Sequence, residues 1–282
     1  MRKIKISLSV LFAFLVVSTQ LLAAEKCLIG KEFSAFKKAN KNLVVIDARK
    51  ATVYAKMHIM KSVNIPHTEL YKAGAVEGLI KDPAVLAAYF GKKGISNTTP
   101  IVIYDDGSSK YNSRVYWVLK YMGAENVQML HKDMAQWKMA RIPLTKSVVA
   151  AKKATFTPKV NKAILAEMPA VKAKTAILVD ARDAVEFDGS FDKSEGHIPG
   201  AINIPYKEVL KANGSFKSKA ELETLAAKYG ITADKEVILY CVTSVRAAVI
   251  YFALNNILGY TNVKVYDGAY NEWVAANNTL DK

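Results

Sequence analysis

A cysteine and an arginine five residues later could together perform chemistry on an anion. Cys241 follows the apolar run 237–240, and Arg246 precedes residues 247–258, which have apolar side chains at helical spacing. A strand, a short loop and a helix would gather the loop amides and the helix N-terminus around the cysteine sulfur, where they favour an anion. Together with the charge of Arg246, they favour the thiolate over the thiol. We therefore predict that Cys241 is a nucleophile inside an anion-binding loop.

The loop between these two residues is expected to bind the substrate. The amides of Val242, Thr243, Ser244 and Val245 would converge on the sulfur and stabilise an anionic intermediate, as an oxyanion site does. The hydroxyl groups of Thr243 and Ser244 could donate to the bound anion or could cap the following helix. A buried structural cysteine is the alternative for Cys241, but its place between strand and helix argues against that role.

The elements that position this loop occur twice in the chain. Residues 44–49 (VVIDAR) match 177–182 (ILVDAR), 101–104 (IVIY) match 237–240 (VILY), and Trp137 matches Trp273 in the same order. Matches in the same order with small insertions indicate a duplicated domain rather than a short-period repeat.

Each half alternates short, continuously apolar strands with helices, as a parallel sheet covered on both faces requires. The fold class is therefore α/β, with two tandem domains that each contain an open, mostly parallel sheet with helices on both faces. Strands are predicted at 44–46, 101–104, 127–130, 177–179, 237–240 and 263–265. Helices are predicted at 31–38, 83–91, 113–121, 219–229 and 247–258. Function is expected at the carboxyl ends of the strands.

The chain divides into four predicted segments. Basic residues 1–5 precede the apolar run 6–22 and Ala23-Ala24, so residues 1–24 are predicted to be a secretory signal peptide, with a retained anchor as the alternative. The first domain is placed at 25–145, a linker at 146–157 and the catalytic domain at 158–282. We expect an exported protein, periplasmic in a Gram-negative source, without a stable membrane anchor after cleavage.

Composition argues against several other classes of protein. The formal charge of +15 comes from scattered lysines, so nucleic acid is not an expected partner. Two cysteines make no disulfide scaffold, and Cys27 is interpreted as an incidental thiol. The four histidines include no i,i+4 pair and lie near no cysteine, so neither a metal nor an organic cofactor is expected.

Several motifs together resemble those of tandem-domain rhodaneses, the thiosulfate and 3-mercaptopyruvate sulfurtransferases. They are Asp180-Ala-Arg182, residues 196–205 (GHIPGAINIP), the loop from Tyr240 to Arg246, and Asp267-Gly268. The resemblance implies that Cys241 carries sulfur as a persulfide and that the N-terminal domain is a silent copy. It also places Arg182 where the family has a substrate-binding arginine, with a salt bridge to Asp183 or Glu186 as the alternative.

The first half agrees with a silent copy, because Asp105 aligns with Cys241. A carboxylate cannot form a persulfide and would repel an anionic sulfur donor. We therefore expect the first domain to support the interface and part of the cleft, without an activity of its own.

Alternative chemistries remain for the loop at Cys241. Cysteine phosphatases and arsenate-type reductases place arginine six positions after cysteine, whereas Arg246 comes five positions after Cys241, so the loop has less room for phosphate. Mercaptopyruvate enzymes typically read Cys-Gly-Ser-Gly-Val-Thr, which this loop does not. A sulfur carrier or sulfide-binding protein without rapid turnover is a third alternative.

The predicted function is transfer of sulfane sulfur from thiosulfate or a related donor to cyanide or a thiol, through a Cys241 persulfide. The partners are then a small anionic sulfur donor and a thiophilic acceptor. No lysine or arginine lies inside the loop between Cys241 and Arg246, which could weaken affinity for a doubly charged donor.

Overall fold

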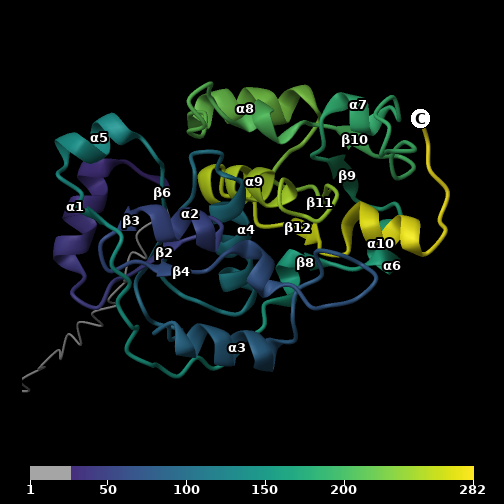
Figure 1. The fold of residues 1–282 in the computed structure, drawn as a ribbon. Coiled ribbons are helices and arrows are strands. Elements are labelled where there is room, and N and C mark those ends of the chain that lie inside the picture. Colours follow the sequence, from purple (N-terminus) through teal and green to yellow (C-terminus); the bar gives the residue numbers. More distant parts are fainter. Residues whose placement is uncertain (1–26) are drawn as a thin grey trace, which may run out of the picture.

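The computed structural model describes residues 27–282, which form two α/β units of matching topology (Figure 1). The predicted signal segment, residues 1–24, lies outside the described residues. No helix among the described residues is long and apolar enough to cross a membrane.

Two parallel sheets of five strands have the same strand order, which confirms the duplication. In the first domain the order is β1 (Cys27–Leu28), β6 (Val127–Leu130), β5 (Ile101–Tyr104), β2 (Val44–Asp47) and β4 (Val63–Asn64). In the second it is β8 (Leu165–Ala166), β12 (Val263–Tyr266), β11 (Val237–Tyr240), β9 (Ile177–Asp180) and β10 (Ile202–Asn203). The short strands β3 (His58–Ile59) and β7 (Leu144–Thr145) form an antiparallel pair.

Helices connect the strands and cover the sheets. The first domain contains α1 (Gly30–Ala39), α2 (Ala51–Lys56), the 3₁₀ helix η1 (His67–Leu70), α3 (Pro83–Lys92), α4 (Lys110–Tyr121) and α5 (Met134–Met139). The second contains the 3₁₀ helix η2 (Lys162–Ile164), α6 (Met168–Lys172), α7 (Ala184–Phe187), the 3₁₀ helix η3 (Tyr206–Val209), α8 (Lys219–Lys228), α9 (Ala247–Tyr251) and α10 (Ala269–Ala275). A π-helical segment, η4 (Phe252–Ile257), continues α9.

Both faces of the second sheet are buried, as its continuously apolar strands predict. Alternate residues of a strand point to opposite faces. Along β11, Leu239 belongs to the core cluster that includes α9, whereas Ile238 and Tyr240 pack in a separate cluster with Trp273 of α10. The prediction of parallel sheets with helices on both faces is confirmed.

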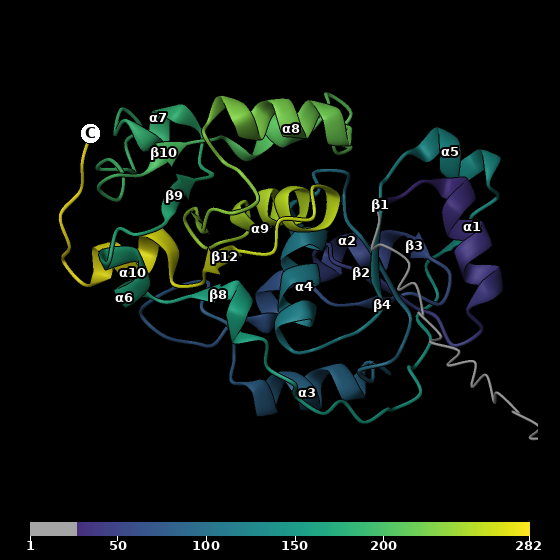
Figure 2. The same ribbon diagram turned by 180° about the vertical axis from the view of Figure 1, so that it is seen from behind.

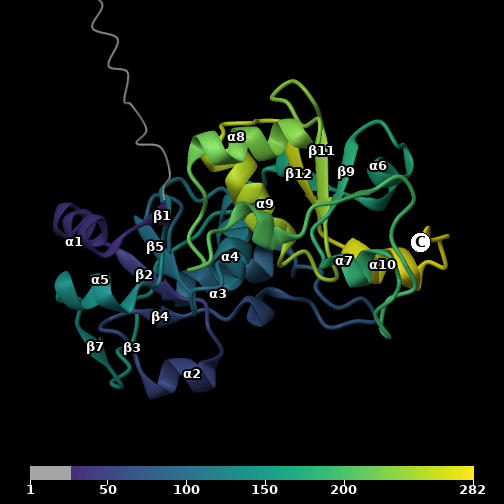
Figure 3. The same ribbon diagram turned by 90° about the horizontal axis from the view of Figure 1, so that it is seen from above.

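One of the apolar core clusters extends across both domains. Helices α4 and α9 lie side by side between the sheets (Figures 2 and 3), and the Tyr116 and Phe252 rings meet edge to face at 5.0 Å between centroids. Helix α9 follows the cysteine loop, and α4 follows the corresponding loop of the first domain. Their contact therefore brings both loops to the domain interface.

The connection between the domains is anchored along α3. Residues 146–161, all of which the structure describes, form neither helix nor strand. The Ala154 amide donates to the Gly91 carbonyl at 2.9 Å, and a Cβ at Gly91 would lie only 2.6 Å from the Ala154 carbonyl oxygen. Phe156 is buried against Phe90, with ring centroids 5.5 Å apart. Backbone and side-chain contacts therefore hold this connection on the first domain.

Candidate active site

Cys241 lies at the carboxyl end of β11, in the middle of the second sheet. It is almost fully buried, at 1 % exposure. Its carbonyl oxygen accepts a hydrogen bond from the Tyr270 amide at 2.9 Å, and the Val242 carbonyl accepts one from the Asn271 amide at 3.3 Å. The first turn of α10 therefore fixes the start of the loop, and the sheet fixes the strand before it.

The loop keeps its backbone donors free. Among the described residues, no protein acceptor receives a hydrogen bond from the amides of residues 242–246. Val245 is buried in the core, whereas Val242 and Thr243 are partly exposed. Unpaired amides in a largely buried loop are costly unless they meet an anion or water. The loop that follows Cys241 therefore has backbone donors available for such a partner.

Ser244 shapes the loop through its backbone and its side chain. Its φ of 59° lies in the left-handed region, where glycine is usual, and its hydroxyl donates to the Tyr266 carbonyl at 2.5 Å. Because this hydroxyl donates inside the protein, it makes neither of the contacts predicted for it, with a bound anion or with the start of the following helix. Ser244 instead anchors the loop to the end of β12.

The corresponding loop of the first domain contains its own anion. The Asp105 carboxylate is 1 % exposed and accepts hydrogen bonds from the Gly107 amide at 2.8 Å, the Ser108 hydroxyl at 3.2 Å and the Tyr111 amide at 3.2 Å. Burial, and then the neighbouring Asp106, raise the pKa of Asp105 to about 6, although the backbone amides oppose the rise. In this loop the donors are therefore occupied by a carboxylate of the chain itself.

Arg246 forms a two-point salt bridge with Glu186 of α7. Its Nη1 lies 2.5 Å from Glu186 Oε2 and its Nη2 lies 2.8 Å from Glu186 Oε1. Burial opposes the charge on Arg246, but the hydrogen bonds to Glu186 and the proximity of Cys241 raise its pKa above the usual value. Arg246 is therefore close to the nucleophile, as predicted, but its charge is already paired.

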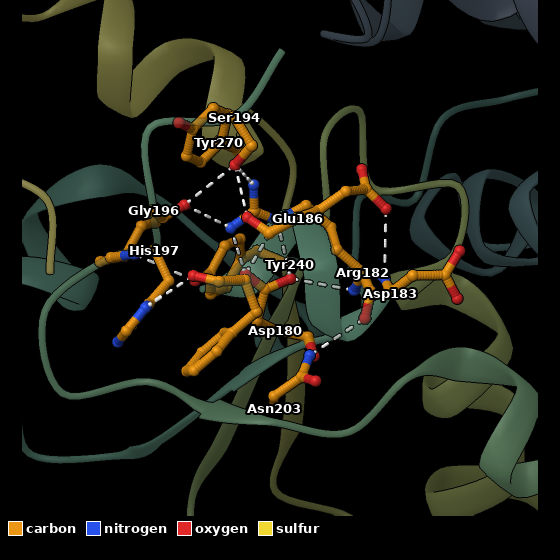
Figure 4. Close-up of polar contacts among 12 residues, drawn as sticks. Asp180, Arg182, Asp183, Glu186, Ser194, Gly196, His197, Asn203, Tyr240 and Tyr270 are labelled. Carbon is orange, nitrogen blue, oxygen red and sulfur yellow. Dashed lines mark hydrogen bonds and ion pairs between the residues drawn. The ribbon is translucent and has the colours of Figure 1, made fainter. Parts of the chain in front are cut away.

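Arg182 belongs to the scaffold beneath the site (Figure 4). It is fully buried, and its Nε and Nη2 contact both oxygens of Asp180 at 2.6–3.0 Å. Its remaining donors reach the Ser194 hydroxyl at 3.0 Å and the Gly196 carbonyl at 2.8 Å. Because every guanidinium nitrogen has a protein acceptor, the structure favours the salt-bridge alternative over substrate binding. The partner is Asp180, however, and not the predicted Asp183 or Glu186.

The first domain reaches the cysteine loop through residues 71–80. A Cβ on Gly78 would lie 2.7 Å from Thr243 Cβ, so the two segments are in close contact. Arg114 of α4 secures this segment, donating to the Gly78 carbonyl at 2.9 Å and to Asp267 at 2.5 Å. Asp267 also accepts from the Ile80 amide at 3.0 Å. The wall beside Thr243 thus comes from the first domain, which was expected to supply part of the cleft.

Tyr71 lies at the start of this wall. Its hydroxyl and His67 Nδ1 are 2.8 Å apart. Burial raises the pKa of Tyr71 to about 12, with Arg114 opposing the rise and the nearby Cys241 adding to it. Tyr71 therefore stays a neutral phenol near the nucleophile.

Sequence reasoning missed the pairing of Glu186 with Arg246, although a signal for it exists. In the first half the position of Glu186 is occupied by Val53 and that of Arg246 by Lys110. Glu186 and Arg246 thus occur together only in the half whose loop contains Cys241. Comparing the two halves position by position would have drawn attention to Glu186.

Among residues 27–282, no group of three histidine, cysteine, aspartate or glutamate side chains is arranged to hold a metal ion.

Comparison with known proteins agrees with this arrangement. The family model for the rhodanese-like domain matches residues 31–140 and again 162–276. A Synechococcus elongatus protein, named provisionally as a thiosulfate sulfurtransferase, is 31% identical over 88% of this chain and 83% of its own length. The sulfur carrier protein TtuD of Thermus thermophilus is 31% identical over 72% of this chain and 84% of its own length.

A solved structure has the same architecture. It is that of Escherichia coli SseA, described as a 3-mercaptopyruvate sulfotransferase, with a TM-score of 0.77 and 27% identity. The match covers 86% of this chain and 98% of SseA. The chain therefore belongs to the rhodanese family and contains two rhodanese-like domains in tandem.

Proposed function

We propose that this protein is a sulfurtransferase that carries sulfur as a persulfide on Cys241. One observation supports the proposal above the others: the amides of residues 242–246, which follow the cysteine, have no protein acceptor among the described residues, whereas in the first domain Asp105 accepts from the amides of Gly107, the counterpart of Thr243, and of Tyr111, at the start of the following helix. A persulfide anion on Cys241 would be stabilised by the same kind of donors that hold the Asp105 carboxylate.

The reaction has two displacement steps. The Cys241 thiolate attacks the outer sulfur of thiosulfate, the S–S bond of the donor breaks, and sulfite leaves with the bonding electron pair. Cyanide or a thiolate then attacks the outer sulfur of the Cys241 persulfide, and the cysteine leaves as a thiolate. Cysteine suits both steps because its thiolate is a strong nucleophile and also a competent leaving group.

Sulfane donors without a carboxylate suit the site better than 3-mercaptopyruvate. A keto acid needs a cation for its carboxylate, and both arginines considered above are engaged, Arg182 with Asp180 and Arg246 with Glu186. We therefore propose thiosulfate or a related sulfane compound as donor. A sulfur carrier without rapid turnover is the second candidate, because the relative TtuD is named as one.

Mass spectrometry of the intact protein tests the proposal. We expect one sulfur to be gained after thiosulfate and lost after cyanide, with thiocyanate as product, and no gain in Cys241→Ser. Sulfur loading by the Cys241→Ser variant would refute the assignment. One sulfur exchanged without repeated turnover would favour the carrier.

We also propose export to the periplasm in a Gram-negative source, supported by the basic, apolar and small-residue order of residues 1–24. Cell fractionation with N-terminal sequencing of the purified protein tests this: a chain that retains residue 1 in the cytosolic fraction would contradict it.

A further inference from the structure

Two acids beside the cysteine loop form ion pairs with neighbouring cations. Arg246 and Glu186 form a two-point contact, with side chains 17 % and 15 % exposed. Asp183 lies 4.0 Å from Arg246 and is itself 3.2 Å from Lys207. Arg246, which interacts with Cys241, is therefore paired with an acid, and the second acid, Asp183, has its own lysine.

This pairing is built into the local structure. Glu186 is the third residue of α7 and also accepts a hydrogen bond from the Asp183 amide at 3.1 Å, which is the capping-box geometry. Two bonds from Arg246 and one from the helix start hold the carboxylate in one place. Although burial opposes ionisation, Arg246 lowers the pKa of Glu186, so Glu186 carries its charge at neutral pH.

A fixed carboxylate so close to the loop discriminates between donors by charge. Coulomb energy scales with the charge of the donor, so a dianion such as thiosulfate feels Glu186 about twice as strongly as a monoanion of the same size. The Cys241 thiolate adds repulsion of the same sign. Resting on the sulfur transfer proposed above, we propose that Glu186 is a specificity determinant: by offsetting the attraction of Arg246, it weakens the preference of this site for thiosulfate relative to sulfane donors with a single negative charge, such as thiosulfonates.

Loading from such a donor balances without any further reactant. With a thiosulfonate R–SO2–S⁻, the Cys241 thiolate attacks the outer sulfur, the donor S–S bond breaks and a sulfinate R–SO2⁻ leaves with the bonding electron pair. The product is the Cys241 persulfide anion, and two negative charges are present before and after. With thiosulfate, by contrast, three negative charges must approach one another.

A matched pair of donors isolates charge from shape. Methanethiosulfonate is a singly charged analogue of thiosulfate, in which a methyl group replaces one oxygen. Both give thiocyanate with cyanide as acceptor, so kcat/KM for each donor is measured with one assay. We expect Glu186→Gln, which keeps an oxygen for Arg246 but removes the charge, to raise kcat/KM for thiosulfate roughly tenfold and for methanethiosulfonate only about threefold.

The chain supplies a matched control. Glu221 is also the third residue of a capped helix, α8, where it accepts from the Ser218 amide at 2.7 Å, but its nearest cation, Lys211, is 3.9 Å away and half exposed. Glu221→Gln therefore reproduces the loss of a capping carboxylate, but of one whose cation is Lys211 and not Arg246. We expect no change in the ratio of kcat/KM for the two donors.

The outcomes separate this inference from the proposed function. If the unmodified protein forms thiocyanate from neither donor and Cys241 gains no sulfur, the proposed sulfur transfer fails. If sulfur is transferred but Glu186→Gln leaves the donor ratio of kcat/KM unchanged, or moves it as Glu221→Gln does, the role of Glu186 is overturned.

Discussion

Replacing Asp105 with asparagine should change how stability depends on pH. The Asp105 carboxyl is buried in the loop of the first domain, where its pKa is raised from 3.8 to about 6. The folded state therefore binds this proton more tightly than the unfolded state. Its contribution to stability is complete below pH 4 and is lost as the pH rises through 6.

The size of the effect follows from the two pKa values. A difference of about two units corresponds to about 3 kcal/mol, since each unit is worth about 1.4 kcal/mol. The Asp105→Asn variant has no proton to lose at this position. Relative to the original protein, it should gain about 3 kcal/mol of unfolding free energy between pH 4 and pH 7. For a protein of this size that equals a relative shift in Tm of roughly 6–12 °C.

Thermal unfolding of both proteins at intervals from pH 4 to pH 7.5 measures the difference. Only the change of this Tm difference with pH tests the prediction, because the asparagine side chain also changes the hydrogen bonds with Gly107 and Tyr111 at every pH. Asp192→Asn, at an exposed carboxylate, is the control and should show no slope of comparable size. A Tm difference for Asp105→Asn that stays constant across this range would refute the reasoning. Sulfur loading of Cys241 should persist in the variant, since Asp105 belongs to the other loop.

Two further substitutions test the domain interface and the active-site ion pair. Arg114→Met leaves Asp267 buried without its partner and releases Gly78, so we expect a loss of roughly 3–5 kcal/mol in unfolding free energy; a loss below about 1 kcal/mol in denaturant unfolding would contradict this role. Arg246→Ala leaves the Glu186 carboxylate unpaired near Cys241, so kcat/KM for thiosulfate should fall strongly, and Glu186→Ala in the same chain should restore part of it. An unchanged kcat/KM in Arg246→Ala would remove this residue from the site.

Much of the fold could be predicted from the sequence because its signals are local. The strands at 101–104, 127–130 and 237–240 are continuous apolar runs, and the structure has them with these bounds. Long helices such as α8 are recognisable from spacing and from the Ser218 cap. Short elements were missed, among them α7, whose four residues are too few to show a helical period.

The sequence by itself determined the duplication and showed where its two halves differ in the residue that follows the central strand. Cys241 stands at the end of a core strand before a helix, and Asp105 stands at the same place in the other half. Both facts concern the order of residues along the chain, so they needed no knowledge of packing.

Only the tertiary structure decided which charges meet at the site. Arg246 and Glu186 are 60 residues apart, and Arg114 and Asp267 are 153 apart, so no local pattern could pair them. Arg182 shows the same limit: its position after a strand allowed either a substrate contact or a salt bridge, and packing beneath the loop surrounded it with Asp180, Ser194 and Gly196. A buried charged side chain pairs with whichever partner folding brings within reach. That partner determines whether the charge remains available to a ligand.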